Sequence, residues 1–420
     1  MFNKSINFIK KIKLKIFPFY KNKEIRFIFN KLQEGSPGNK IVARFVGGCV
    51  RKYLSGDRID DIDIATTLNS ENIKEKFRNS NIKVIDTGIK YGTITLVSKN
   101  FKLEITTLRK DIETDGRHAE VEYIDDWKKD SERRDFTINA IYLDINGKIF
   151  DPQSGMLDLK NNIVKFIGDP QTRIEEDYLR IIRFIRFKIL YNGEIEPTTS
   201  KAIKQNLNGI AKISKERVLV ELYKILDLKN FILLNDNTDL KEIFTKIFPE
   251  FNKLNRLDRM KKINDYYKIN RSLLLAVLLI DKDNSHEYFS HKYNISNDVK
   301  ESLNLYAKNL NLIKQNKDFF NKDIEKNIYL NDKKYLIELN ILNFIINPKV
   351  KLNDFSSILK KILKSKTHQF TIDGKYLMAN GMQQGAIIGK VLKKIEEEWI
   401  KNDFKISNER VLEIIRSHTN

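Results

Sequence analysis

The stretch Gly47-Gly48-Cys49-Val50-Arg51, followed about ten residues later by Asp61-Ile62-Asp63, decides the fold of the first half of the chain. Adjacent glycines let backbone amides approach a phosphate group, and a helix N-terminus behind them attracts the same anion. Side chains alternate along a strand, so Asp61 and Asp63 share one face while Ile62 points into the core. Two carboxylates on one face repel each other, and a hard divalent cation relieves that repulsion. The pattern therefore predicts a phosphate loop beside a metal-binding strand.

Further strands surround this segment. Apolar runs and period-two alternation predict strands over residues 41–46, 59–65, 91–97, 101–107, 139–144 and 148–151, with the third and fourth as a hairpin. Glu104 lies on the strand face opposite Leu103 and Ile105, which makes it a candidate third carboxylate. The polar stretch 111–123, with Gly116 inside it, predicts a mobile loop.

Helical periodicity replaces the strand pattern from about Arg173 onward. Apolar residues of the stretch 181–190 fall on one helical stripe. Further helices are predicted over residues 214–228, 240–251, 271–281, 298–315 and 333–347. The predicted fold is an α/β head, with a mixed sheet and flanking helices, followed by an all-α array.

Charge and length suggest a partner class. The chain has 420 residues, with 76 Lys and Arg against 56 Asp and Glu, which gives a formal net charge of +20. Its length suits roughly two to four domains. A surplus of this size attracts polyanions, above all RNA or DNA. Lys, Asn and Ile are abundant throughout, as in proteins of AT-rich genomes, so charge alone leaves nucleic-acid binding and codon drift equally open.

Composition also bears on the compartment. The first 23 residues contain several lysines and no acidic residue. They lack arginine and are poor in serine, which favours a basic N-terminal extension over a mitochondrial import peptide or a membrane-surface helix. Cys49 is the single cysteine, which excludes a disulfide framework and suits a reducing compartment. No apolar run approaches the ~20 residues that a membrane span needs. These features predict a cytoplasmic protein of bacterial type with no membrane partner.

Residues 47–51 and 61–66 together resemble the first motif of the nucleotidyltransferases that include tRNA CCA-adding enzymes and bacterial poly(A) polymerases. The resemblance implies that Asp61 and Asp63 hold divalent metal, most simply Mg²⁺, that Glu104 is the third catalytic acid, and that Gly47, Gly48 and Arg51 bind the nucleotide. One position departs from the family pattern: an acid usually follows the Val-Arg pair, and this chain has Lys52. The departure leaves the role of position 52 open.

The stretch 133–140, Arg-Arg-Asp-Phe-Thr-Ile-Asn-Ala, resembles the second motif of the same family. Adjacent arginines offer forked donors to phosphate oxygens, and a nearby carboxylate can accept from ribose hydroxyls. The resemblance implies that Arg134, Asp135 and Asn139 contact the incoming nucleotide.

Glu176-Asp177-Tyr178-Leu179-Arg180 matches the E-D-x-x-R motif of the CCA-adding enzymes. We expect it to open a helix that continues through Arg183, with Asp177 and Arg180 on one face. The bland alternative is a local ion pair. In the functional interpretation, the carboxylate accepts from the exocyclic amine of C or A and the arginine donates to the ring edge. Uracil and guanine present a carbonyl in place of that amine, so the pair would reject them. The resemblance places Asp177, Arg180 and Arg183 in the nucleotide site.

The resemblance covers most of the chain and implies a division into a basic N-terminal extension (1–24), a head (25–167), a neck (168–230), a body (231–325) and a tRNA-binding tail (326–420). It implies addition of CCA to tRNA from CTP and ATP. Residues 115–121 and 214–217 resemble the family's flexible loop and neck motif. A poly(A) polymerase, a partial CC- or A-adding enzyme and a catalytically inactive RNA-binding protein are the alternatives. The oligomeric state is left open.

Overall fold

A computed structural model describes residues 18–37, 40–114, 119–263, 267–316 and 318–418. The chain forms two compact units, residues 1–249 and 250–420. The predicted basic extension falls mostly outside the described residues. None of the helices within the described ranges is both long and apolar enough to cross a lipid bilayer.

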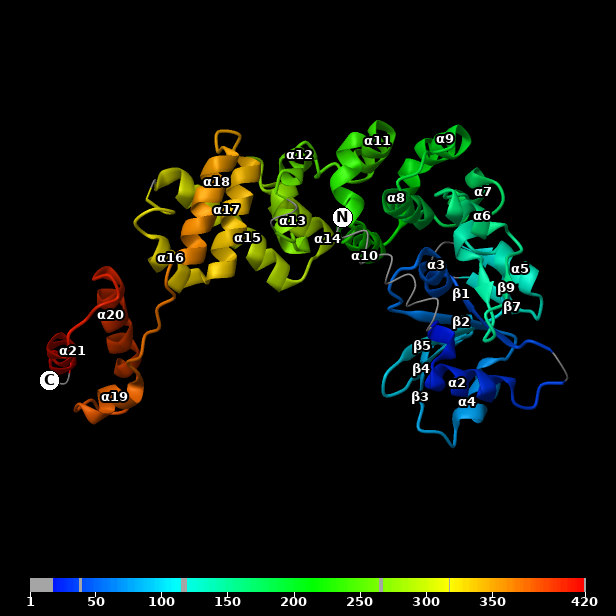
Figure 1. Cartoon of the computed structure of the whole chain (residues 1–420), viewed down its shortest axis with the longest axis horizontal. Helices are drawn as coiled ribbons and strands as arrows, with labels where there is room; N and C mark the ends of the chain where they lie inside the picture. The colour runs from blue at the N-terminus through cyan, green and yellow to red at the C-terminus, as the bar shows by residue number, and fades with distance from the viewer. Residues whose placement is uncertain (1–17, 38–39, 115–118, 264–266, 317, 419–420) are drawn as a thin grey trace. The chain divides into compact units, whose positions relative to one another are not determined.

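The head of the first unit is built on a seven-stranded mixed sheet (Figure 1). Its strand order is β3-β4-β5-β2-β1-β8-β9. The pair β2–β5 is parallel and the other neighbouring pairs are antiparallel. The strands are β1 (Ala43–Val46), β2 (Ile62–Thr66), β3 (Lys83–Gly88), β4 (Thr93–Val97), β5 (Lys102–Thr107), β8 (Tyr142–Leu143) and β9 (Ile149–Phe150).

The alternation of β2 and β5 separates a core face from a polar face. Ile62, Ile64, Leu103 and Ile105 are buried in one cluster with apolar residues of helix α2 (Lys23–Gln33), whereas Asp63 and Glu104 lie on the opposite side of their strands. Phe19 and Tyr20 also pack against this cluster. The predicted α/β head with alternating strands is therefore confirmed.

The remaining helices of the first unit flank the sheet and then continue as a helical segment. They are α3 (Gly48–Ser55), α4 (Ser70–Phe77), α5 (Trp127–Glu132), α6 (Gly155–Lys160), α7 (Pro170–Glu176), α8 (Leu179–Tyr191), α9 (Pro197–Asn206), α10 (Lys215–Leu226) and α11 (Thr238–Ile247), with 3₁₀ turns at Phe19–Lys21, Ile89–Tyr91, Thr137–Asn139, Leu207–Lys212 and Lys229–Asp236. In α8, the apolar stripe predicted from the sequence is buried.

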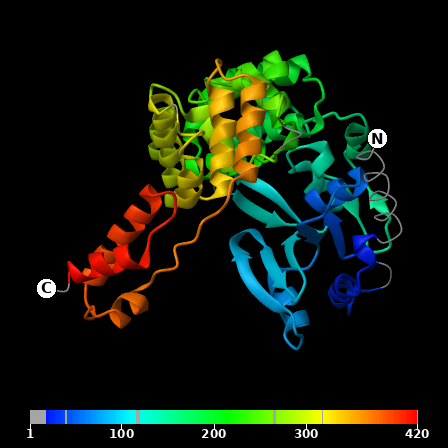
Figure 2. The same cartoon turned by 60° about the vertical axis from the view of Figure 1, so that its left-hand side comes forward.

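The second unit consists of helices joined by turns and coil, with no strand among its described residues. Its helices are α12 (Arg256–Lys261), α13 (Arg271–Leu279), α14 (Ser285–Tyr293), α15 (Asn297–Gln315), α16 (Ile324–Asn331), α17 (Lys333–Ile346), α18 (Leu352–Lys364), α19 (Gly374–Ala379), α20 (Ile387–Lys401) and α21 (Asn408–Arg416). The antiparallel pair α17 and α18 lies side by side (Figures 1 and 2). The last three helices share a small apolar core of their own. The predicted all-α second half is confirmed, while the five-part division stays a prediction.

Two local predictions were wrong. The stretch 111–123, predicted as a loop, belongs largely to an antiparallel hairpin of β6 (Arg109–Thr114) and β7 (Ala119–Tyr123). A two-stranded ribbon outside the main sheet needs no apolar alternation, so its polar sequence resembles a loop. The predicted flexible-loop residues 115–118 lie outside the described residues. Asn139, predicted to begin a strand, instead ends a 3₁₀ turn, and β8 begins at Tyr142.

Candidate functional site

A cleft of about 710 Å³ in the first unit gathers the candidate residues. It is lined by Gly47, Gly48, Arg51, Lys52, Asp61, Asp63, Arg109, Asp111, Arg133, Arg134, Asp135, Asn139, Asp177, Leu179, Arg180, Arg183, Arg186, Phe187, Arg217 and Lys224. Every predicted site residue except Glu104 is among them. Ten of these side chains are Lys or Arg and five are Asp, so the cleft is built for an anion.

The glycine pair forms the turn from β1 into α3. Gly47 has φ +72°, a conformation that residues with a Cβ seldom adopt, and it precedes the first turn of α3. A Cβ at Gly47 would lie 3.7 Å from Asp63 Oδ2. Arg51, one turn into the helix, is buried, donates a hydrogen bond to Asn139 Oδ1 and lies 4.7 Å from the centre of the Phe187 ring. The helix N-terminus, its glycines and a fixed guanidinium therefore face the carboxylates.

Asp61 immediately precedes β2 and Asp63 lies within it. Burial raises the pKa of Asp63 to about 6, helped by the charge of Glu104 and opposed by that of Arg134. Glu104 is the register partner of Asp63 on β5, although its side chain is half exposed and lies 3.9 Å from Lys102 Nζ. Burial and neighbouring negative charge therefore disfavour the ionised form of Asp63 more than the nearby arginines favour it.

This donor set fits a hard divalent cation. Within the described ranges, no three Asp, Glu, His or Cys side chains form a group that could hold a metal by themselves. Mg²⁺ is usually bound by one or two carboxylates together with substrate phosphates. Asp61 and Asp63 supply such a pair at the edge of a cation-rich cleft. The metal assignment of these two residues, and the role of Glu104 beside them, stay predictions.

Asp130 anchors the arginine pair of the second motif, a role that was not predicted from the sequence. Its fully buried carboxylate accepts from Arg133 Nε at 2.8 Å, from Arg134 at 3.1 Å and from the Tyr142 hydroxyl at 2.7 Å. Burial alone would raise the pKa of Asp130, but the charges of Arg134 and Arg133 hold it at about 2. Both arginines are therefore fixed with their remaining donors available to the cleft.

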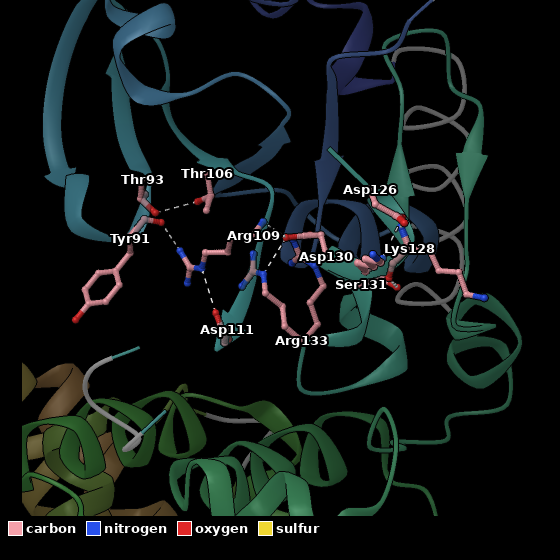
Figure 3. Close-up of polar contacts among 12 residues, drawn as sticks. Tyr91, Thr93, Thr106, Arg109, Asp111, Asp126, Lys128, Asp130, Ser131 and Arg133 are labelled. Carbon is pink, nitrogen blue, oxygen red and sulfur yellow. Dashed lines mark hydrogen bonds and ion pairs between the residues drawn. The ribbon is translucent and has the colours of Figure 1, made fainter. Parts of the chain in front are cut away.

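Figure 3 shows this anchor beside the root of the β6–β7 hairpin, where Arg109 lies between Tyr91 and Asp111. Arg109 donates to the Tyr91 carbonyl, and its Nε lies 3.5 Å from Asp111 Oδ1. The backbone N–H of Arg109 lies 3.4 Å from Asp130 Oδ1. The first residue of the hairpin thus contacts the same Asp130 carboxylate that holds the arginine pair. Arg109 and Asp111 both line the cleft.

Asp135 connects the head to helix α8. It accepts from Arg183 Nε at 2.7 Å and from the Asn139 amide at 2.8 Å. Burial opposes ionisation, but the Arg183 charge dominates and the pKa of Asp135 falls to about 2. Asp135, Asn139 and Arg183, which the sequence could only group by motif, are therefore one hydrogen-bonded cluster.

The E-D-x-x-R motif does not open a single helix, contrary to our expectation. Glu176 ends α7, Asp177 is extended with φ −155°, and α8 begins at Leu179. At the break, Asp177 Oδ1 accepts from the backbone N–H of Leu179 at 3.1 Å, two residues on, which is the spacing of an Asx-turn. The bland alternative, a local Asp177–Arg180 ion pair, is not what the described residues form: Arg180 pairs with Glu176 and Asp177 pairs with Arg217, the latter at 2.9 Å.

Arg186 and Lys224 also line the cleft and were missed in the sequence. Arg180, Arg183 and Arg186 recur every three residues, so their spacing on one helix could have revealed the last of them. Lys224 carried no such signal, because its place depends on how α10 packs beside α8. Lys52, the departure from the family pattern, forms an ion pair with Asp60 at 3.0 Å at the cleft edge.

Acid should weaken this part of the fold through Asp130. Its pKa is lowered from 3.8 to about 2, so its contribution is complete above pH ~4 and is lost as the pH falls toward 2. We expect Asp130→Asn to unfold more easily than wild type by roughly 3 kcal/mol at pH 6, because three donors lose a buried charge. Urea unfolding of both proteins at several pH values should show that gap closing below pH ~4. The exposed Asp125→Asn is the control; an unchanged gap at low pH would contradict the assignment.

Comparison with known proteins agrees with this architecture. Residues 43–165 match the family model of the poly A polymerase head domain, and residues 193–254 match that of the probable RNA- and SrmB-binding site of polymerase A. The human CCA tRNA nucleotidyltransferase 1, mitochondrial, is 34% identical over 384 residues, which cover 89% of this chain and 86% of the human protein. The CCA-adding enzyme of Lactobacillus helveticus is 32% identical over 84% of this chain and 88% of its own length.

Among solved structures, the Bacillus stearothermophilus CCA-adding enzyme in complex with CTP superposes with a TM-score of 0.68. The match covers 93% of this chain and 95% of that one at 24% identity, and so shows a shared fold. Relatives include bacterial and mitochondrial proteins, so the cytoplasmic location stays a prediction. The chain belongs to the family of CCA-adding tRNA nucleotidyltransferases, which shares its head domain with the poly(A) polymerases.

Proposed function

We propose that this protein adds CCA to the 3′ ends of tRNAs, using CTP and ATP and no nucleic-acid template. The observation that carries the proposal is the cleft itself, where a phosphate loop, a carboxylate pair and the E-D-x-x-R residues line one cavity. The relatives support the proposal by their names, CCA tRNA nucleotidyltransferase and CCA-adding enzyme. The similarity to them also spans most of both chains.

In the proposed site, the amides at Gly47 and Gly48 and the Arg51 and Arg134 guanidinium groups hold the triphosphate. Asp61 and Asp63 hold Mg²⁺, with Glu104 adding negative charge beside them. When bound, the metal ions would activate the RNA 3′-hydroxyl and neutralise the leaving pyrophosphate.

The ribose would meet the cluster of Asp135, Asn139 and Arg183. Arg183 donates to Asp135, and Arg51 donates to Asn139. These bonds keep the two acceptor side chains in one orientation. Their oxygen and amide groups can bond sugar hydroxyls, which would favour ribonucleotides over deoxyribonucleotides. The site would therefore select ribonucleotides through the sugar, independently of the base.

The base would be selected by Asp177 and Arg180, each held by a different neighbour. Arg217 fixes the Asp177 carboxylate and Glu176 fixes the Arg180 guanidinium. A carboxylate oxygen can accept more than the one hydrogen bond that each Asp177 oxygen receives from Leu179 or Arg217. Among the described residues, the hydrogen bonds of Arg180 use one terminal nitrogen. The pair can thus present an acceptor and a donor to the Watson–Crick edge of C or A without bonding to each other.

The direct test supplies Mg²⁺, each NTP separately, and tRNAs that end before C, after C and after CC. We expect incorporation from CTP and ATP, none from UTP or GTP, and arrest at CCA. Repeated A addition to arbitrary RNA would instead identify a poly(A) polymerase. Addition limited to CC or to the final A would identify a partial enzyme, and RNA binding without addition would contradict the catalytic proposal.

A further inference from the structure

A second cationic cluster of the cleft lies at the junction of α8 and α10. Arg186 Nε lies 2.8 Å from Glu221 Oε2, and Lys224 Nζ donates to Glu221 Oε1 at 2.9 Å. Glu221 is 3% exposed, whereas the Lys224 side chain is 50% exposed. One buried carboxylate therefore holds two cations, and both cations line the cleft.

This cluster lies beside the phosphate loop. The guanidinium carbons of Arg186 and Arg51 lie 4.4 Å and 4.7 Å from the centre of the same Phe187 ring. Arg51 is bonded through its backbone N–H to the Gly47 carbonyl at 3.0 Å. A continuous series of contacts thus runs from the glycine turn to Glu221.

Helix α10 also fixes the direction in which a nucleotide would lie. Arg217, near the start of α10, holds Asp177 at the proposed base-reading end. Lys224 is two turns further along the same helix face, about 10 Å away at the usual helical rise. A nucleotide whose base contacts Asp177 would therefore extend its phosphates toward Lys224.

The charges leave a surplus at this end. Among the described residues, Arg186 and Lys224 share the Glu221 carboxylate. Arg173 and Arg180 likewise share Glu176, so cations outnumber carboxylates in both groups. Within the described residues, the Arg186–Glu221 contact is an ion pair without hydrogen-bond geometry, since neither Nε nor Oε2 has a hydrogen-bond partner. An anion in the cleft would complete the charge balance.

We propose that Lys224 is a further phosphate-binding residue of the cleft and that Glu221 is the positioning residue that aims it. The anion is the terminal phosphates of the incoming nucleoside triphosphate. This inference rests on the proposed function, because it takes the nucleotide orientation from the base-reading residues. A phosphodiester of the RNA 3′ end has the same chemistry and is the competing source.

The test measures the Kd of CTP and of CMP with Mg²⁺ and no RNA, for wild type, Lys224→Met and Glu221→Gln. Loss of one charge-assisted hydrogen bond should raise the Kd of CTP about tenfold or more in Lys224→Met. The Kd of CMP should be unchanged, because the lost contact is to phosphates that CMP lacks. Lys224→Arg should restore most of the affinity. In Glu221→Gln the Kd of CTP should rise without a change in the preference for CTP and ATP over UTP and GTP.

Lys246→Met is the matched control, since Lys246 is 53% exposed, bonds a carboxylate one helical turn away and lies outside the cleft. An unchanged Kd of CTP in Lys224→Met would overturn the inference, and so would an equal loss of CMP binding. If only the KM for tRNA and its salt dependence change, the phosphate belongs to the RNA and the inference is also wrong. Failure of the wild type to bind CTP would instead sink the proposed function.

Discussion

Asp63→Ala is expected to reduce nucleotide addition by roughly a thousandfold or more, because metal-assisted charge stabilisation contributes several kcal/mol to the transition state. The charges of Asp61 and Glu104 act on the Asp63 carboxylate, and a Cβ added at Gly47 would lie 3.7 Å from its Oδ2, so Asp63 lies between the other acids and the glycine turn. Single-turnover extension of a tRNA that lacks CCA measures the effect. Asp61→Ala should behave in the same way.

The same substitution should leave the fold intact. The negative charges of Asp61 and Glu104 repel that of Asp63, and burial opposes its ionisation. Removing its carboxylate therefore relieves an electrostatic cost, and the thermal unfolding midpoint should not fall. Retained tRNA binding would separate a catalytic defect from a folding defect. Asp125→Ala, at an exposed acid outside the cleft, is the control. Near-wild-type addition by Asp63→Ala would remove the metal assignment.

The second large effect is expected for Arg180→Ala. Arg180 is held by Glu176 and by the Arg173 carbonyl, so in the proposed site its guanidinium would meet the base in a fixed position. One good donor–acceptor pair discriminates between bases by about 1–3 kcal/mol. We therefore expect the preference for CTP over UTP to fall by roughly ten- to a hundredfold, with addition itself still detectable. The ratio of kcat/KM for CTP and UTP measures it.

Two companion variants sharpen that result. Arg26→Ala changes an exposed arginine on α2, outside the cleft, and should leave the ratio unchanged. Arg217→Ala removes the partner of Asp177 and should weaken selection without removing either base contact. If Arg180→Ala slows CTP and UTP addition equally, the arginine contributes to rate alone and the selection model fails.

Short-range signals in the sequence predicted the head well. Ile62 and Ile64 alternate with Asp63, and Leu103 and Ile105 alternate with Glu104, so strand period alone separated the core face from the polar face. The two strands proved to be parallel neighbours in register, with Asp63 opposite Glu104. That proximity was expected from the resemblance and cannot follow from either strand taken separately.

Side-chain contacts that periodicity does not encode explain what could not be predicted from the sequence. Asp130 reads as a surface acid on a short polar helix, yet Tyr142 and two arginines surround it. At the helix break, the Asp177 side chain bonds the backbone N–H of Leu179, a contact that helical periodicity does not encode. Lys224 reaches the cleft only because α10 packs beside α8. In each case the deciding partner is distant in sequence or is a backbone group.

The most direct test of the site is a crystal structure of the protein with CTP and Mn²⁺, with the metal located by anomalous scattering. We expect an anomalous peak within bonding distance of the Asp61 and Asp63 carboxylates, shared with the CTP phosphates. A peak that contacts the triphosphate but neither carboxylate, or CTP bound outside the cleft, would contradict the account.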